Sequence, residues 1–191
     1  MKAKAEELGF LKGVILLYLL GFVIGFGIFL GFQEKLTDGV YGFYADLIYN
    51  LEHYEISSIE LLKKVIVTEF QSFFLLALFG ISILGIPYIF CFLVGNGVLG
   101  GFLLGSMLIT FGSKGILVSV LYGFPQVFLY VPVKLAMIHK SYDMGMYGLK
   151  KKLLLEQIPS VIILLGILLA GCFMEAYVNT WILKKILLWL G

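Results

Sequence analysis

Gln126, Lys134 and Glu175 lie inside long apolar stretches of the 191-residue sequence, and their side chains could take part in chemistry. An ionisable residue inside a membrane span is a functional hypothesis by default, because a charge among lipid chains is expensive. A transporter would use such groups along a substrate or ion pathway. The alternative for Glu175 is a place at the membrane interface, where its carboxylate faces water. Gln71 is a candidate neighbour of Glu175.

Prolines interrupt the same apolar stretches. Pro125 and Pro132 place two helix breaks beside Gln126, and Pro87 predicts a kink further upstream. Irregular backbone at membrane depth is tolerated only where it is buried in protein or lines a wet cavity. Broken helices of this kind form binding sites in transporters. The alternative is a structural kink whose freed backbone groups are satisfied within the protein.

Glycine recurs at every fourth residue in one apolar stretch, at Gly97, Gly101 and Gly105, with Gly100 alongside. Small residues at this spacing form one helical face and let two helix backbones approach closely. The spacing therefore predicts a helix contact on this face. The partner is either another helix of this chain or a helix of a second protein, which includes a second copy of the chain.

The sequence contains no recognisable catalytic motif. His53 and His139 are the two histidines, and we expect membrane spans between them, so they cannot form a metal site or a nucleophile–base pair. All basic residues are lysines, which excludes mechanisms that need an arginine fork on phosphate or carboxylate. Cys91 and Cys172 lie in apolar runs and are expected to behave as small hydrophobes. We therefore expect no enzyme, no metal and no cofactor.

The composition is that of a membrane protein. Hydrophobic residues make up 61% of the chain and charged residues 14%, against about 45–50% and about 25% in soluble domains. We expect an all-α, polytopic membrane protein: one domain over residues 1–191, with about five transmembrane helices of about 20 residues each. A turn is expected at Gly95-Asn96-Gly97. The expected spans are residues 13–32, 70–93, 97–113, 116–138 and 158–183.

Residues 34–69 form the longest polar segment, which we expect to be an extracytoplasmic loop. Thr37-Asp38 offers a cap for one short amphipathic helix, and Ser57 with Glu60 forms a capping box for a second. The segment is too short to bury a useful core of its own. Both helices are therefore predicted to lie in the membrane interface. The lipid bilayer is the expected partner, since a net charge of +2 gives no indication of nucleic-acid binding.

Several motifs, taken together in order and spacing, resemble the stage II sporulation protein M family of endospore-forming bacteria. The resemblance covers roughly residues 70–138 and 170–180, and residues 34–69 do not match the family's pattern. The motifs are FGISILGIP at 79–87, GVLGGFLLG at 97–105, FPQ at 124–126, VP at 131–132 and EAYV at 175–178. They supply the candidates for helix packing or partner contact: Gly85, Pro87, Gly97, Gly101, Gly105, Pro125, Gln126, Pro132, Glu175 and Tyr177.

The resemblance implies a function in forespore engulfment. Members of this family are understood to work with stage II sporulation proteins D and P, which degrade peptidoglycan at the septum. On this hypothesis the chain is a non-enzymatic scaffold in the mother-cell septal membrane that anchors and recruits these hydrolases. The alternative is a small membrane transporter or permease subunit that uses Gln126, Lys134 and Glu175. Active transport would then need an ATPase partner or an ion gradient.

The lysine distribution predicts the orientation in the membrane, with the amino terminus in the cytoplasm and the carboxyl terminus outside. Reporter fusions at Met1, Lys151 and Gly191 should therefore read inside, inside and outside. A cytoplasmic signal at Gly191 with the other two inside would require an even number of spans and would refute the five-span topology. Eight lysines lie inside on this topology, with Lys134 reaching the headgroups by snorkelling: Lys2, Lys4, Lys12, Lys134, Lys140 and Lys150 to Lys152.

Overall fold

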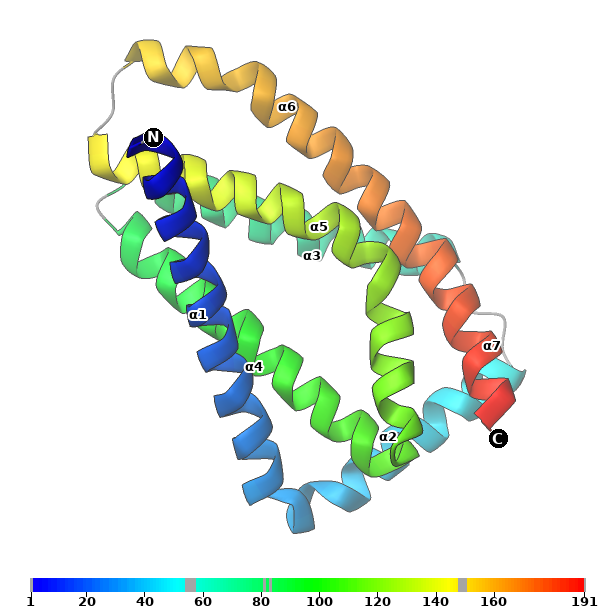
Figure 1. Cartoon of the computed structure of the whole chain (residues 1–191). Coiled ribbons are helices and arrows are strands. Elements are labelled where there is room, and N and C mark those ends of the chain that lie inside the picture. The colour runs from blue at the N-terminus through cyan, green and yellow to red at the C-terminus, as the bar shows by residue number, and fades with distance from the viewer. Residues whose placement is uncertain (1, 54–57, 81, 83, 148–150, 191) are drawn as a thin grey trace. The chain divides into compact units, whose positions relative to one another are not determined.

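The computed structural model describes residues 2–53, 58–80, 82, 84–147 and 151–190, and within them every regular element is a helix (Figure 1). The all-α prediction is therefore confirmed for the described part of the chain. Its elements are α1 (Lys2–Gly31), α2 (Gln33–His53), α3 (Ser58–Gly80), α4 (Gly85–Phe111), α5 (Lys114–Tyr147), α6 (Lys151–Phe173), the π-helix η1 (Met174–Asn179) and α7 (Thr180–Leu190).

The chain folds into two compact units. Unit 1 comprises Met1–Asp46 and Phe90–Ser119, and unit 2 comprises Leu47–Ile89 and Val120–Gly191. Unit 1 therefore contains α1, the first part of α2, most of α4 and the start of α5. Unit 2 contains α3, most of α5, and the continuous run from α6 through η1 to α7.

Glycines on α1 bring its backbone into direct contact with α4 in unit 1 (Figure 1). A Cβ atom on Gly21 would lie 2.9 Å from the Cα of Val94, and one on Gly25 would lie 2.6 Å from the Cα of Val98. Real Cβ atoms essentially never come within 3.0 Å of another heavy atom. No side chain can therefore stand at either position without moving the helices apart.

The glycine face predicted on α4 forms the other side of this contact. A Cβ on Gly97 would lie 2.8 Å from the backbone nitrogen of Phe22, and one on Gly101 would lie 2.7 Å from that of Phe26. One turn further, Gly105 accommodates the ring of Phe29, which is almost fully buried. We call Gly21, Gly25, Gly97, Gly101 and Gly105 the glycine seam. The predicted helix contact is thus present, and within unit 1 its partner is α1 of the same chain.

Tyrosines on α2 attach its first half to the end of α4. The hydroxyl of Tyr41 donates to the carbonyl of Ile109 at 2.8 Å, and the hydroxyls of Tyr44 and Ser106 share a hydrogen bond of 3.1 Å. Burial raises the pKa of Tyr44 above its ordinary value, and the bond to Ser106 partly offsets this. The side chain therefore stays a neutral phenol that can act as the donor.

Two tight turns bound α4. Before it, the backbone N–H of Gly85 donates to Ser82 O at 2.9 Å, and that of Leu84 donates to the hydroxyl of Ser82 at 3.0 Å. After it, Gly112 has a φ of +59°, which glycine adopts without the penalty that a Cβ would bring. The first turn thus depends on the Ser82 hydroxyl, and the second on a glycine at position 112.

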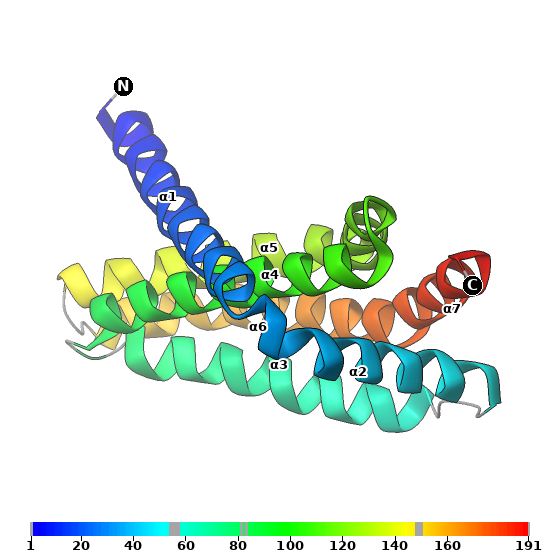
Figure 2. The same cartoon turned by 90° about the horizontal axis from the view of Figure 1, so that it is seen from below.

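Helices α3, α5 and α6 make up the body of unit 2. Figure 2 shows α3 alongside α6 and running in the opposite direction. The fully buried hydroxyl of Ser141, on α5, donates to the carbonyl of Leu76, on α3, at 2.9 Å. A side-chain hydrogen bond therefore joins two helices at a site closed to water.

The predicted boundaries between residues 70 and 113 are wrong. Gly95-Asn96-Gly97 is not a turn but lies inside α4, and the expected span 70–93 is divided where α3 ends at Gly80 and α4 begins at Gly85. Pro87 does not kink a helix there. It is the third residue of α4, in the first turn, where backbone N–H groups have no helical acceptor and proline is tolerated.

The predicted polar segment also divides differently. Thr37 does not cap a helix. It lies inside α2, and its hydroxyl donates to the carbonyl of Gln33 at 2.6 Å. The second expected amphipathic helix does not end near Glu69, because α3 continues to Gly80. Ser57 of the predicted capping box lies outside the described residues.

Three helical stretches among the described residues are long and apolar enough to cross a membrane, namely Gly9–Gly31, Gly85–Phe111 and Ile158–Ile186. The first covers the expected span 13–32 up to residue 31, and the third contains the expected span 158–183. The second replaces the expected pair 70–93 and 97–113. The expected span 116–138 lies within α5 and stays a prediction.

The glycine seam predicts a contrast between two substitutions on α4. Gly101→Ala should destabilise the protein by about 1–3 kcal/mol, because its methyl group would overlap the backbone of α1. Gly95→Ala is the matched control, since no atom lies within 4 Å of a Cβ at that position. It should be neutral or stabilise the helix by up to about 1 kcal/mol. Denaturant unfolding in detergent measures both, and equal effects would contradict a backbone contact at Gly101.

Candidate functional site

An ion pair joins α3 to α5 in unit 2. The ammonium of Lys134 lies 3.0 Å from Oε2 of Glu69 and donates to Oε1 at 3.3 Å. The two side chains are only 25% and 16% exposed. Each charge is therefore largely removed from solvent, and each compensates the other.

A second polar contact joins α5 to η1. The hydroxyl of Tyr130 donates to Oε2 of Glu175 at 2.8 Å. The tyrosine ring lies against Gly171, where a Cβ would come within 2.8 Å of the ring atom Cδ1. Glycine at this position, one turn before Glu175, thus leaves the space that the ring needs to reach the carboxylate.

Tyr130 connects the two contacts. The ammonium of Lys134 lies 5.3 Å from the centre of the Tyr130 ring, within the range of a cation–π interaction. We call Glu69, Tyr130, Lys134 and Glu175 the polar cluster. Its members come from three different elements, and with both carboxylates ionised it has two negative charges and one positive charge. Glu175 lies within the apolar stretch Ile158–Ile186.

The backbone beside the cluster is irregular. Residues Met174–Asn179 form a π-helix inside an otherwise α-helical run, and π-helical turns occur frequently at functional sites. The π-helix ends with Asn179, whose side chain is 1% exposed and has no hydrogen-bond partner for either polar atom among the described residues. Buried amides normally have partners, so this side chain needs an explanation.

The residues that the sequence singled out differ in how exposed they are in the structure. Tyr177, on η1, is 45% exposed, and Glu175 is half-buried. Pro125 and Gln126 lie within α5, and their side chains fall outside the described part of the structure. The buried members of the set are Gly85, Gly97, Gly101 and Gly105, and the exposed members besides Tyr177 are Pro87 and Pro132.

Three members of the cluster were placed incorrectly or missed by sequence reasoning. Lys134, which was expected to reach the headgroups, pairs with Glu69, which was expected at the opposite face. The reason is that α3 continues to Gly80, so Glu69 lies near the middle of this helix and not at the end of a shorter one. The partner of Glu175 is Tyr130, whereas the side chain of Gln71 is exposed. The available signal was the presence of Lys134 and Glu175 as isolated charges in apolar stretches, since each needs a partner.

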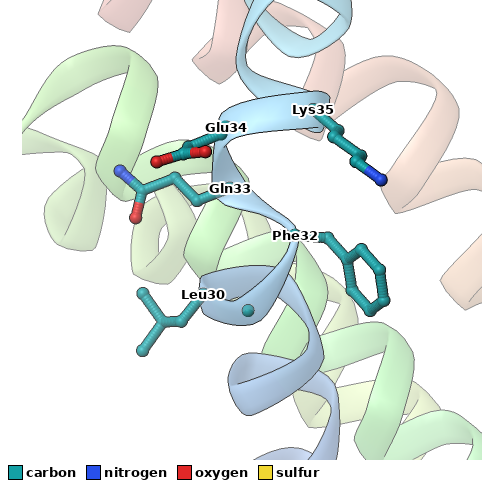
Figure 3. A pocket seen from close by; sticks show the side chains of 6 residues that line it. Leu30, Phe32, Gln33, Glu34 and Lys35 are labelled. Carbon is teal, nitrogen blue, oxygen red and sulfur yellow. The ribbon is translucent and has the colours of Figure 1, made fainter.

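An open hollow of about 510 Å³ lies at the junction of α1 and α2 in unit 1. Figure 3 shows that Leu30, Gln33 and Glu34 point to one side of the ribbon, whereas Phe32 and Lys35 point to the other. The polar groups therefore do not converge on a common point, and the hollow is a weaker candidate site than the polar cluster.

The fold and site define an all-helical chain in which three apolar helices are long enough to span a membrane and a paired polar cluster lies among the helices of unit 2. Among the described residues no three histidine, cysteine, aspartate or glutamate side chains gather as a metal site. No protein-family model, curated protein or solved structure matches the chain.

The ion pair predicts that replacing one of its two charged residues destabilises the protein more than replacing both. Lys134→Met should destabilise the protein by about 1–3 kcal/mol, because it leaves the Glu69 carboxylate without its counter-charge. Adding Glu69→Leu to this variant should recover most of the loss, since no buried charge then remains. Lys63→Met, at an exposed position on α3, is the control and should change stability by less than about 0.5 kcal/mol. If the double variant is less stable than Lys134→Met in denaturant titration, the pair does not work in this way.

Proposed function

We propose that this chain is a non-enzymatic membrane scaffold that anchors peptidoglycan-degrading partners at the sporulation septum during forespore engulfment. The resemblance of its motifs to the stage II sporulation protein M family supplies the process and the partners, stage II sporulation proteins D and P. The partners carry the hydrolytic chemistry, and the scaffold holds them at the mother-cell septal membrane.

One observation supports a scaffold in particular: the polar cluster is paired across helices. Lys134 binds Glu69 of α3, and Tyr130 binds Glu175 of η1. In an apolar surrounding, such contacts hold helices together, because separating them would leave a polar group without a partner. Polar residues in this arrangement serve the assembly of unit 2, as a scaffold requires.

The exposed motif residues are the candidates for contact with partners. Pro87, Pro132 and Tyr177 present their side chains at the surface, whereas the motif glycines are buried. A partner's helix can therefore reach the first group without displacing a helix of this chain. Because residues 34–69 lie outside the resemblance, partner contacts there have no support.

The second candidate is a small transporter or permease subunit. The same cluster favours it, because it has two carboxylates against one ammonium and places Glu175 within an apolar stretch, and transporters use such costly charges to bind ions or protons. The two functions differ in what Glu175 must do. A scaffold needs its hydrogen bond to Tyr130, whereas an ion- or proton-coupled carrier needs its charge.

Substitution of Glu175 distinguishes the two functions. Glu175→Gln keeps an acceptor for the Tyr130 hydroxyl, so a scaffold should retain engulfment. Glu175→Ala leaves that hydroxyl unpaired at a cost of about 1–3 kcal/mol and should impair assembly. The measurement is engulfment in a sporulating host, scored with a membrane dye, together with co-purification of the wall hydrolases.

Glu34→Ala is the control, because it removes an exposed carboxylate from unit 1. It should leave both engulfment and co-purification unchanged. If Gln and Ala at residue 175 both block engulfment while the hydrolases still co-purify, recruitment is not the essential role, and the transporter hypothesis gains.

A further inference from the structure

The polar cluster has an excess negative charge. Lys134 lies within ion-pair distance of Glu69, 3.0 Å from its Oε2. Glu175 receives a hydrogen bond from the Tyr130 hydroxyl, which is a neutral donor. When both carboxylates are ionised, one negative charge is therefore uncompensated inside an apolar helical stretch. A charge in such a place is rare unless a partner of opposite charge or a proton neutralises it.

Asn179 independently indicates that a ligand is needed at the same place. Its amide is 99% buried, and neither its oxygen nor its nitrogen has a partner among the described residues. Asn179 follows Glu175 by four residues in the same π-helix, so the two side chains belong to the same short, irregular segment. No hydrogen bond joins them.

The backbone hydrogen bonding is also irregular at this point. At the end of the π-helix the N–H of Thr180 donates to the carbonyl of Tyr177, three residues back, so the hydrogen-bond ladder changes register beside Asn179. Irregular helices inside membranes use backbone carbonyls at such points to coordinate sodium ions or protons. Carboxylate, amide and backbone carbonyl oxygens are all ligands that hard cations prefer.

We propose that unit 2 binds a monovalent metal cation, such as Na⁺, between Glu175 and Asn179. A single positive charge neutralises the cluster, whereas a divalent ion would leave an excess positive charge. The cation also gives the Asn179 oxygen a partner, which a proton on Glu175 would not do. This inference is independent of the scaffold function, because a scaffold and a transporter can each contain such a site.

Thermal unfolding of the full chain in detergent tests the proposal. The midpoint should rise by several degrees as NaCl replaces choline chloride at constant ionic strength and pH, and the rise should saturate, as expected for a ligand that binds only the folded state. Asn179→Leu and Glu175→Gln should each abolish the rise. Asn179→Leu should still fold, because replacing an unpaired buried amide with an apolar group of similar size costs little.

Glu34→Gln removes an exposed carboxylate from unit 1 and should keep the full rise. Three results would overturn the proposal. An unfolding midpoint that is equal in NaCl and choline chloride would mean that water alone satisfies Asn179. A rise of equal size in all variants would be a general salt effect. A rise that persists in Asn179→Leu would exclude the amide as a ligand.

Discussion

The direct contact between the backbones of α1 and α4 is the constraint on which unit 1 depends. In an apolar surrounding the hydrophobic effect gives two apolar helices no reason to associate, so close packing must supply the attraction. Gly21 and Gly25 on one helix and Gly97 and Gly101 on the other provide it, because they have no Cβ where the other helix's backbone approaches. The hydrogen bonds from α2 to α4 add to this contact but do not replace it.

Unit 2 is held together in a different way. Its helices are joined by the bond from Ser141 to Leu76, by the pair of Lys134 with Glu69, and by the contact of Tyr130 with Glu175. Polar contacts of this kind are directional, so they fix how helices are placed along and around one another. They also leave charge in the interior. Glu175 therefore has two roles: it joins η1 to α5 through Tyr130, and it is a ligand of the proposed cation site.

The class of fold and the glycine face could be predicted from sequence, because apolar content and four-residue spacing are local signals. Gly21 and Gly25 repeat that spacing in α1 and could have been found in the same way. The break between Gly80 and Gly85 was missed because an uncharged run of that length is also compatible with a turn at Gly95-Asn96-Gly97. Only the hydrogen bonds around Ser82 distinguish the two.

The polar cluster could be predicted only in part. Glu175 and Lys134 stand out as charges in apolar stretches, but their partners depend on how the helices are aligned, which no local pattern encodes. The position of Glu69 in the middle of α3 was missed because the helix was expected to end near that residue, whereas it continues to Gly80. The π-helix at Met174–Asn179 has no composition that sets it apart from an α-helix. Its position depends on packing between elements far apart in the chain.

The glycine seam also has a consequence for the order of events during synthesis. Its two halves lie far apart in the chain, so α1 is complete before the ribosome has begun α4. At roughly 5–20 residues per second, several seconds pass between the two. Throughout that interval Gly21 and Gly25 form an unpaired face that any other helix with small residues could occupy. The backbone contact of unit 1 therefore cannot form until α4 has been made.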